Sequence, residues 1–394
     1  MRLHRHLCDS TLALAKSVLL EHRVLDHELA TAFEENKKWG KRDRNFVAET
    51  LFEVTRWRRC LSYLVDSEET NSIVTAQWIL MGYELPDWHS YNGLPAEEII
   101  ARQETLPDQP RAIRQSIPDW LDTLGFSELG DLWEPQLTAL NCKPSVFLRV
   151  NTLLTTVEEA TAWLAENGVE TTPVVDHPHA LALPPGKILP KALRIDGRIE
   201  IQDPSSQHIA PLLDPQPGER IIDACSGAGG KALHLCALSN NEARIFAMDV
   251  DENKLTQLKK RARLARATEI SPKPITATTP TEFENVADSL IIDSPCSGLG
   301  TLKRQPDLKW RLKPAALERV RSIQSQLLSE YPKMLKPGGK LLYATCSILP
   351  SENQLQIDRL LKNNPGAYEL ISQENLLPSE TGHDGFHASL LLKK

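Results

Sequence analysis

Three short segments of the sequence carry residue types that could do chemistry. One is the glycine-rich run DACSGAGGK at 223–231, and the other two, DSPCSGLGT at 293–301 and YATCSILPSEN at 343–353, each contain a cysteine. Glycines let the backbone pass close beneath a ligand, and a thiolate is a nucleophile when nearby cations or a helix N-terminus lower its pKa. These segments therefore predict a ligand-binding turn and one or two reactive thiols.

The glycine-rich run separates a short apolar stretch from a helical pattern, as expected for a strand-to-helix turn that binds a ligand. Asp249 ends the next predicted strand, roughly 20 residues later, where a carboxylate can accept hydrogen bonds from ribose hydroxyls. This pairing predicts an adenosine-containing cofactor, either a dinucleotide or S-adenosylmethionine. A tight structural turn without a ligand would use the same glycines.

Each cysteine segment directly follows an apolar stretch that predicts a strand. Open α/β sheets bind ligands at the carboxyl ends of their strands, so Cys296 and Cys346 are expected to meet in one cleft beside the turn. The plainer alternative for the first is a Pro/Gly loop with a small buried cysteine. A cysteine hydrolase is disfavoured because no histidine stands in any of the three segments.

The elements that must position these segments alternate between strands and helices from residue 219 onward. Alternation of this length predicts a parallel sheet with helices on both faces. The predicted fold class is a multidomain α + α/β protein with a Rossmann-like C-terminal domain. Strands are predicted at 220–224, 244–249, 287–293 and 340–345, and helices at 231–238, 252–267 and 315–335.

Two further units are expected before that sheet. Apolar stripes at 12–19 and 46–57 predict helices, and Asp43 could cap the second. A strand, a helix and a strand at 146–154, 157–167 and 170–175 predict a small α+β unit. The expected domains are a helical domain at 1–135, a connecting α+β subdomain at 141–200 and the Rossmann-like domain at 201–394.

Composition excludes several classes of protein. The 394 residues are 41% hydrophobic and 25% charged, with no apolar run of the roughly 18 residues that would span a membrane. The N-terminus shows no secretory signal. Seven widely spaced cysteines without a C-x-x-C pair disfavour both a disulfide framework and a structural zinc site. We therefore expect a cytoplasmic protein without a metal or a membrane partner; we also expect a monomer.

The net charge of −7 would by itself argue against a nucleic-acid partner, but the charge is strongly segmented. Residues 62–140 hold 3 basic and 14 acidic residues. In contrast, 251–273 holds 7 basic and 3 acidic residues, and 303–313 holds 5 and 1. The two basic patches are compatible with RNA, and the acidic stretch is expected to face away from it.

Taken together, the three motifs resemble those of the NOP2/Sun/RsmB family of RNA cytosine-C5 methyltransferases. The likeness continues at 149–151, 202–206, 306–310 and 382–386, and so covers residues 140–394. It implies a class I methyltransferase domain that uses S-adenosylmethionine to methylate RNA, with 16S ribosomal RNA as the expected substrate. A weaker likeness at 41–47 implies that the helical domain is a NusB-like RNA-binding domain.

By this resemblance, Cys346 is the nucleophile that adds to C6 of cytosine, and Cys296 takes part in releasing the product. Asp293 matches the acid that contacts the base, and Lys231 is placed near the base, where its charge could keep Cys346 ionised. Phosphate contacts are expected from the basic helix at 252–266 and from Lys303, Arg304, Lys309 and Arg311. The expected cofactor contacts are Asp223, Cys225, Ser226, Gly227, Ala228, Gly229, Gly230, Lys231, Asp249 and Asp293.

Two positions depart from the family pattern. Ala228 stands where the family usually has proline, which implies a less stiff turn, and 275–280 lacks the usual acidic residue on the adenine side of the cofactor. Both departures concern cofactor affinity. Other functions stay open: methylation of tRNA or another RNA, a catalytically silent RNA-binding assembly protein, and a nicotinamide-dependent dehydrogenase. Neither binding nor hydride transfer needs two thiols.

Overall fold

The computed structural model describes residues 3–91, 93–187 and 189–394, and its chain divides into two compact units. The first contains Met1–Cys142 together with Leu302–Pro314, and the second contains Lys143–Thr301 and Ala315–Lys394. The small α+β unit expected at 141–200 thus clusters with the Rossmann-like part. The segment Leu302–Pro314, which was expected in the Rossmann-like domain, clusters with the helical unit instead.

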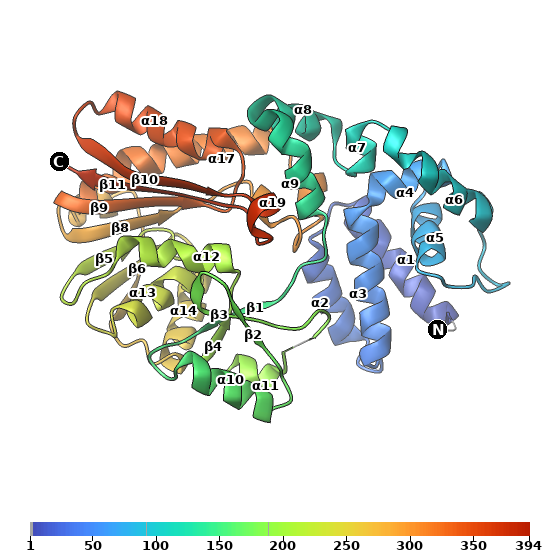
Figure 1. Ribbon diagram of the computed structural model, residues 1–394, viewed down its shortest axis with the longest axis horizontal. Coiled ribbons are helices and arrows are strands. Elements are labelled where there is room, and N and C mark those ends of the chain that lie inside the picture. The colour runs from blue at the N-terminus through green and yellow to red at the C-terminus, as the bar shows by residue number, and fades with distance from the viewer. Residues whose placement is uncertain (1–2, 92, 188) are drawn as a thin grey trace. The chain divides into compact units, whose positions relative to one another are not determined.

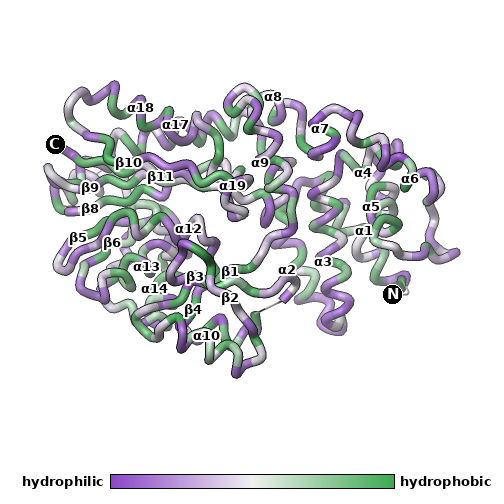
Figure 2. The backbone as a smooth tube through the Cα atoms, viewed as in Figure 1, coloured by the Kyte–Doolittle hydropathy of each residue, from purple (hydrophilic) through white to green (hydrophobic). Residues whose placement is uncertain are grey.

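The first unit is helical (Figure 1), and the buried apolar side chains between Leu3 and Ile99 share one core. Figure 2 shows hydrophobic and hydrophilic residues alternating along α1 and α3, which confirms the two predicted stripes. Asp43 caps α3 from its first turn, because its Oδ2 accepts the Gly40 N–H at 3.1 Å. The helices are α1 (Arg5–Leu19), α2 (Leu25–Glu35), α3 (Lys41–Arg56), α4 (Arg58–Val65), α5 (Thr70–Leu80), α6 (Ala96–Arg102), α7 (Arg111–Arg114), α8 (Asp119–Leu129), α9 (Trp133–Leu140) and α16 (Leu308–Arg311).

The segment Leu302–Pro314 is held in the first unit by buried polar groups. Lys309 is 2% exposed, and its Nζ donates to the carbonyl oxygen of Arg56 at 2.8 Å and to Asn141 Oδ1 at 3.2 Å. Trp310 Nε1 donates to the carbonyl oxygen of Thr55 at 2.6 Å. Burial lowers the pKa of Lys309 well below its usual value.

The prediction that Lys309 contacts RNA phosphates was therefore wrong, because its ammonium is hydrogen-bonded inside the unit. Lys303, which was also expected at the surface, is buried. Arg311 Nε lies 2.7 Å from Asp307 Oδ2, so its charge is matched locally. Lys303, Lys309 and Arg311 thus serve the packing of the helical unit, whereas Lys313 is exposed.

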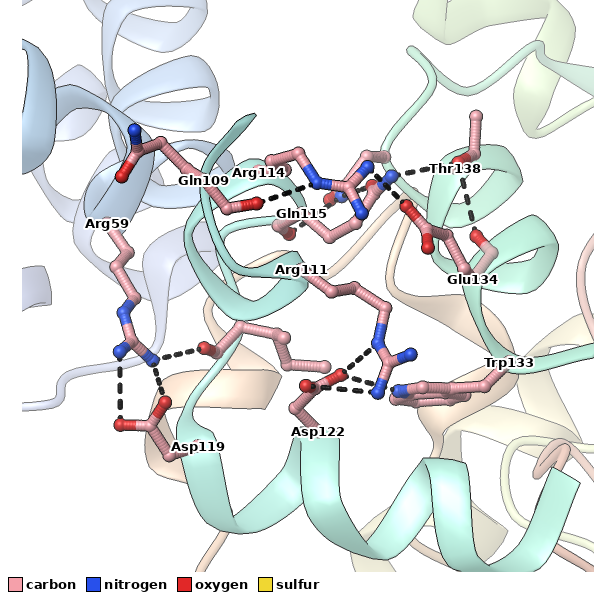
Figure 3. Close-up of polar contacts among 12 residues, drawn as sticks. Arg59, Gln109, Arg111, Arg114, Gln115, Asp119, Asp122, Trp133, Glu134 and Thr138 are labelled. Carbon is pink, nitrogen blue, oxygen red and sulfur yellow. Dashed lines mark hydrogen bonds and ion pairs between the residues drawn. The ribbon is translucent and has the colours of Figure 1, made fainter. Parts of the chain in front are cut away.

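Within the acidic stretch 62–140, carboxylates pair with the few cations nearby (Figure 3). Arg111 makes a two-pronged pair with Asp122, at 2.7 and 3.2 Å, and Trp133 Nε1 donates to Asp122 Oδ1 at 2.9 Å. A second pair joins Arg59 to Asp119 at 2.7 Å. The Asp122 side chain is 16% exposed and that of Asp119 is 77% exposed, so only the first pair is shielded from water.

A small antiparallel sheet opens the second unit, with strand order β2-β3-β1-β4. It confirms the predicted strand, helix and strand at 146–175, and adds two strands. Thr156 starts α10 with a capping box, in which its side chain and that of Glu159 satisfy each other's backbone N–H. The elements are β1 (Phe147–Val150), α10 (Val157–Glu166), β2 (Thr172–Val174), β3 (His177–Ala182), α11 (Lys191–Arg194) and β4 (Ile199–Ile201).

The large sheet of the second unit has strand order β10-β11-β9-β8-β5-β6-β7. The strands from β9 to β7 in this order pair in parallel, as predicted, and β11 joins β9 in antiparallel pairing. Its strands are β5 (Arg220–Asp223), β6 (Arg244–Asp249), β7 (Ile270–Pro274), β8 (Ala287–Asp293), β9 (Leu335–Thr345), β10 (Tyr368–Leu376) and β11 (Phe386–Lys393).

Helices cover both faces of this sheet, with α13 and α14 on one side and α17 and α18 on the other (Figure 1). Successive side chains of a strand point to opposite faces of the sheet, so each face has its own hydrophobic core. Ile221 packs into one of these cores and its neighbour Ile222 into the other. The prediction of helices on both faces is confirmed, whereas the β10–β11 hairpin was missed. The helices are α12 (Pro204–Ile209), α13 (Gly230–Leu238), α14 (Glu252–Leu264), α15 (Thr279–Glu282), α17 (Pro314–Glu330), α18 (Gln354–Asn363) and α19 (Pro378–Thr381).

Replacing Asp122 by alanine should destabilise the helical unit by about 2 kcal/mol, because it leaves Arg111 and the buried Trp133 N–H without their acceptor. The matched control is Asp119→Ala, whose exposed ion pair should contribute less than ~1 kcal/mol. Urea unfolding of both variants measures the difference. Equal losses of stability would contradict the assignment.

Candidate functional site

The loops that follow β5, β8 and β9 lie together at the carboxyl edge of the parallel strands. β8 pairs with both β5 and β9, with Asp293 opposite Ala344. Backbone bonds continue this pairing past the strands: the Ser294 N–H donates to the Ala344 carbonyl at 2.8 Å, and the Gly300 N–H to that of Cys346 at 2.9 Å. The three motif segments therefore meet at one edge, as the strand-end rule predicts.

The glycine-rich turn is shaped by left-handed glycines and by Asp249. Gly229 has φ +90°, and a Cβ there would lie 2.6 Å from Leu258 Cγ, so only glycine fits. Asp249 Oδ2 accepts the N–H of Gly227 at 2.8 Å, and Asp249 Oδ1 accepts the N–H of Asp251 at 2.9 Å. Gly227 is also left-handed, with φ +55°. Asp249 thus shapes the turn, a role that its spacing in the sequence did not predict.

A hydrogen bond restrains the turn at Ala228, where the family usually has proline. Arg261 Nη1 donates to the Ala228 carbonyl oxygen at 2.6 Å, and the same guanidinium pairs with Glu200 at 2.7 Å. Arg261 belongs to the basic helix that was expected to contact phosphates, but its charge is used inside the unit. The exposed cations of α14 are Lys254, Lys259, Lys260 and Arg263.

Asp223 ends β5 as a fully buried carboxylate, and neither of its oxygens has a hydrogen-bond partner among the residues that the structure describes. Burial, and next the charge of Asp293, raise the pKa of Asp223 to about 7. Ser226 Oγ, in the same turn, is also buried without a partner in that described part of the chain. A buried acceptor of this kind fits a ligand that brings a positive charge or a donor.

Lys231 and Asp293 form an ion pair, with Nζ 2.5 Å from Asp293 Oδ2. The Lys231 side chain is 8% exposed, and its Nζ also lies 5.3 Å from the ring centroid of Phe386. The ammonium that was expected to keep Cys346 ionised is thus paired with a carboxylate. Phe386 was not singled out from the sequence, although it stands in the 382–386 likeness.

Cys296 and Cys346 lie with their Sγ atoms 3.2 Å apart, and both are partly buried. The contact with the Cys346 thiol raises the pKa of Cys296 well above its usual value, and burial adds to this effect. Cys296 is therefore a neutral thiol at neutral pH. In the glycine-rich turn, burial likewise raises the pKa of the Cys225 thiol well above its usual value, so that thiol is unreactive.

Two glycines allow the C-terminal segment to reach the cysteine loops. The Gly385 N–H donates to the Gly300 carbonyl oxygen at 2.8 Å. A Cβ on Gly300 would lie 2.1 Å from the Gly385 carbonyl oxygen and 2.8 Å from that of Cys346, so a side chain would push these segments apart. Sequence reasoning missed this role, because the contact joins three segments that are distant in the chain.

Neither a metal-binding cluster nor a membrane-spanning helix is present in the described part of the chain. Within 3–91, 93–187 and 189–394, no group of three or more His, Cys, Asp or Glu side chains is arranged to hold a metal ion. In the same ranges, no helix combines the length and the hydropathy needed to cross a bilayer.

The strand order and the glycine-rich turn after the first parallel strand define a class, the Rossmann-like domains that carry methyltransferases. The family of 16S rRNA methyltransferases RsmB/F matches residues 210–392, and the ferredoxin-like domain of RsmF/B-like methyltransferases matches 117–187. The crystal structure of PH0851 superposes with a TM-score of 0.82 over 100% of both chains, at 23% identity.

The ribosomal RNA small subunit methyltransferase B of Pasteurella multocida is 35% identical over 295 residues, covering 70% of this chain and 65% of that protein. The protein of the same name from Shigella sonnei is 32% identical over 308 residues, covering 76% and 70%. The chain belongs to the NOP2/Sun/RsmB family. It spans slightly less than two thirds of the length of the Pasteurella relative.

Replacing Asp223 by asparagine should stabilise the ligand-free protein, and more so at pH 8 than at pH 5. The unfolded state loses the Asp223 proton near its ordinary pKa of 3.8, and the native state keeps it to about 7. Wild-type stability therefore falls as pH rises across this window, and the gap to the variant should widen by a few kcal/mol. Urea unfolding at both pH values measures the difference in free energy of unfolding between variant and wild type. A difference that does not change with pH would contradict the raised pKa of Asp223.

Proposed function

We propose that the chain transfers a methyl group from S-adenosylmethionine to C5 of a cytosine in RNA, with 16S ribosomal RNA as the substrate. Family membership supports methyl transfer to RNA, and the names of the relatives support the choice of RNA. The observation that carries the proposal is the pair of cysteines with Sγ atoms 3.2 Å apart, one of them in the loop that also holds Asp293.

Two thiols suit this reaction because C5 of cytosine is a poor nucleophile. The Cys346 thiolate adds to C6, and the electron pair displaced into the ring makes C5 nucleophilic. C5 would then take the methyl group as the bond from that group to the positively charged sulfur of the cofactor breaks, which would leave a neutral thioether. Loss of the C5 proton to a base such as solvent water would restore the ring double bond and expel the Cys346 thiolate, and Cys296 would assist this release.

The ion pair of Lys231 and Asp293 is proposed to hold the base. Asp293 would contact the N3 and amino edge of cytosine, where a fixed polar partner spreads the charge that develops when the thiolate adds. The Lys231 ammonium, 2.5 Å from Asp293, orients this carboxylate before the base arrives. Such preorganisation removes the need for solvent to rearrange during the reaction.

The turn after β5 is proposed to bind the cofactor. The buried Asp223 carboxylate lacks a partner within the described residues, and the ammonium group of S-adenosylmethionine would supply one. Asp249 would accept hydrogen bonds from the ribose while it holds Gly227 in place. The proposed contacts are Asp223, Cys225, Ser226, Gly227, Ala228, Gly229, Gly230, Lys231, Asp249 and Asp293.

For the RNA, we propose phosphate contacts from the exposed cations Lys254, Lys259, Lys260 and Arg263 of α14. The helical unit is proposed to be a NusB-like RNA-binding domain, with the acidic stretch 62–140 turned away from the RNA. A stacked cytosine must leave its helix to reach the thiols, at a cost of a few kcal/mol.

Transfer of a labelled methyl group to unmethylated 16S ribosomal RNA tests the proposal directly. Labelling of tRNA instead would identify another RNA as the substrate. With saturating enzyme and cofactor, failure to label either RNA would favour a silent assembly protein. Bisulfite sequencing of both RNAs from cells with and without the protein locates the modified cytosine.

Replacing Cys346 by alanine should abolish methyl transfer, because no thiolate remains to add to C6. Replacing Cys296 by alanine should instead leave a covalent protein–RNA adduct, because release is impaired after the bond to Cys346 has formed. Denaturing gels of the protein with labelled RNA detect the adduct. Full turnover by the Cys346 variant would refute the nucleophile assignment, and absence of an adduct would count against the release role.

Replacing Asp249 by alanine should weaken S-adenosylmethionine binding about tenfold or more, because it removes both the ribose acceptor and the restraint on Gly227. Titration calorimetry measures the affinity, and the urea midpoint shows whether the variant is folded. Unchanged affinity in a folded variant would refute the assignment of Asp249 to the cofactor.

A further inference from the structure

One buried carboxylate joins the two cysteine loops. Glu352 is 0% exposed and ends the short turn Pro350–Glu352 that follows β9. Its Oε1 accepts the backbone N–H of Ser297 at 2.7 Å and Gln324 Nε2 at 3.1 Å. Its Oε2 accepts the hydroxyls of Ser297 and Ser347, each at 2.5 Å. All four of these donors are neutral.

The two serines occupy equivalent places, since Ser297 directly follows Cys296 and Ser347 directly follows Cys346. Their hydroxyl oxygens lie 3.3 Å apart. A hydroxyl has only one proton to donate, so when both protons point at Glu352 none remains to join the serines to each other. The carboxylate therefore joins the two Cys-Ser pairs through their side chains, in addition to the backbone bond from Gly300 to Cys346.

We propose that Glu352 is a positioning residue for methyl transfer, whose ionised carboxylate sets the 3.2 Å separation of the Cys296 and Cys346 sulfurs by clamping the serines beside them. The inference rests on the proposed function, because it assigns the clamp to that reaction. Glu352 acts through Ser297 and Ser347.

The chemistry of the donors requires a carboxylate rather than an amide. Four donors need acceptors only, which an ionised carboxylate provides with its two oxygens. Glutamine has the same shape but offers one acceptor oxygen and an NH₂ group, which would face donors. Burying a charge among neutral partners is costly, so an apolar side chain would be the better choice if packing alone were needed.

Neighbouring side chains extend the clamp on both sides. Gln324 of α17 also donates to the carbonyl oxygen of Pro295, the residue before Cys296, at 3.0 Å. Asn353 Nδ2 donates to the Ser347 carbonyl oxygen at 2.9 Å and its Oδ1 accepts the Thr345 hydroxyl at 2.5 Å. Both cysteine loops are thus fixed on each side of the sulfur.

The charge of Glu352 also affects the pKa of the neighbouring Cys296 thiol. After the contact with Cys346 and burial, it is among the causes that raise the pKa of Cys296 well above its usual value. The clamp therefore favours a neutral Cys296 thiol beside the proposed nucleophile. A neutral side chain at 352 would remove this contribution to the raised pKa of Cys296.

The test compares the variant Glu352→Gln with the variants Ser297→Ala and Ser347→Ala. The serine variants keep the carboxylate, so they can still be measured if Glu352→Gln does not fold. Ile245→Val, which trims the core on β6 outside both loops, controls for destabilisation alone. For Glu352→Gln we expect kcat to fall about 10²-fold, as for a small misplacement of reacting groups, with KM for RNA and cofactor affinity within about twofold. Each serine variant should show a smaller loss of kcat.

A second readout does not depend on activity. Dibromobimane becomes fluorescent when it bridges two neighbouring thiols, so wild-type protein should be labelled across Cys296 and Cys346. Glu352→Gln and the serine variants should be labelled more slowly, and Ile245→Val at the wild-type rate. A variant lacking both cysteines gives the background from the remaining thiols.

The outcomes separate the two claims. If Glu352→Gln keeps the wild-type kcat and the wild-type bridging rate, the clamp is overturned. Where Glu352→Gln does not fold, the same result in both serine variants overturns it. Losses of equal size in Ile245→Val would overturn it as well. If wild-type protein transfers no methyl group but the bridging rate still depends on Glu352, the proposed function fails and the clamp on the sulfurs stands.

Discussion

The hydrogen-bond register between β8 and β9 is the constraint on which the site depends. It sets Asp293 opposite Ala344, so the chain leaves both strands at the same edge and reaches a cysteine within a few residues on each side. The pairing continues through Ser294 and Gly300 into the loops themselves. A slip of one residue would turn every side chain to the other face of the sheet and separate the two sulfurs.

Three acidic residues near this edge differ in the partners of their carboxyl groups, because their surroundings differ. Asp293 pairs with the ammonium of Lys231, whereas Glu352 is buried among neutral donors that its four contacts satisfy. Asp223 is buried with no hydrogen-bond partner at 3.5 Å or less among the described residues, and its pKa is raised to about 7. In the proposed function, the first carboxylate contacts the base, the second holds the cysteine loops, and the third accepts a ligand with a positive charge.

The basic residues show why charge counted along a chain says little about an interface. The stretch 303–313 has a local excess of positive charge, yet Lys309 donates to backbone and amide oxygens and Arg311 pairs with Asp307. On α14, Arg261 is likewise used internally while its neighbours are exposed. Whether a cation is available to RNA depends on which carbonyls and carboxylates the fold brings near it.

The sequence alone determined the alternation of strands and helices, the three motif segments at strand ends, and the family, because these depend on local periodicity and on short runs of residues. The paired sulfurs were expected only as a shared cleft; their 3.2 Å contact, the Lys231–Asp293 pair and the bonds of Asp249 within the turn depend on tertiary structure. The role of Glu352 and the burial of Lys309 did not emerge from the motifs, because their partners lie in distant segments. Local patterns record which face of an element is apolar, and only the packed chain decides which polar atoms meet.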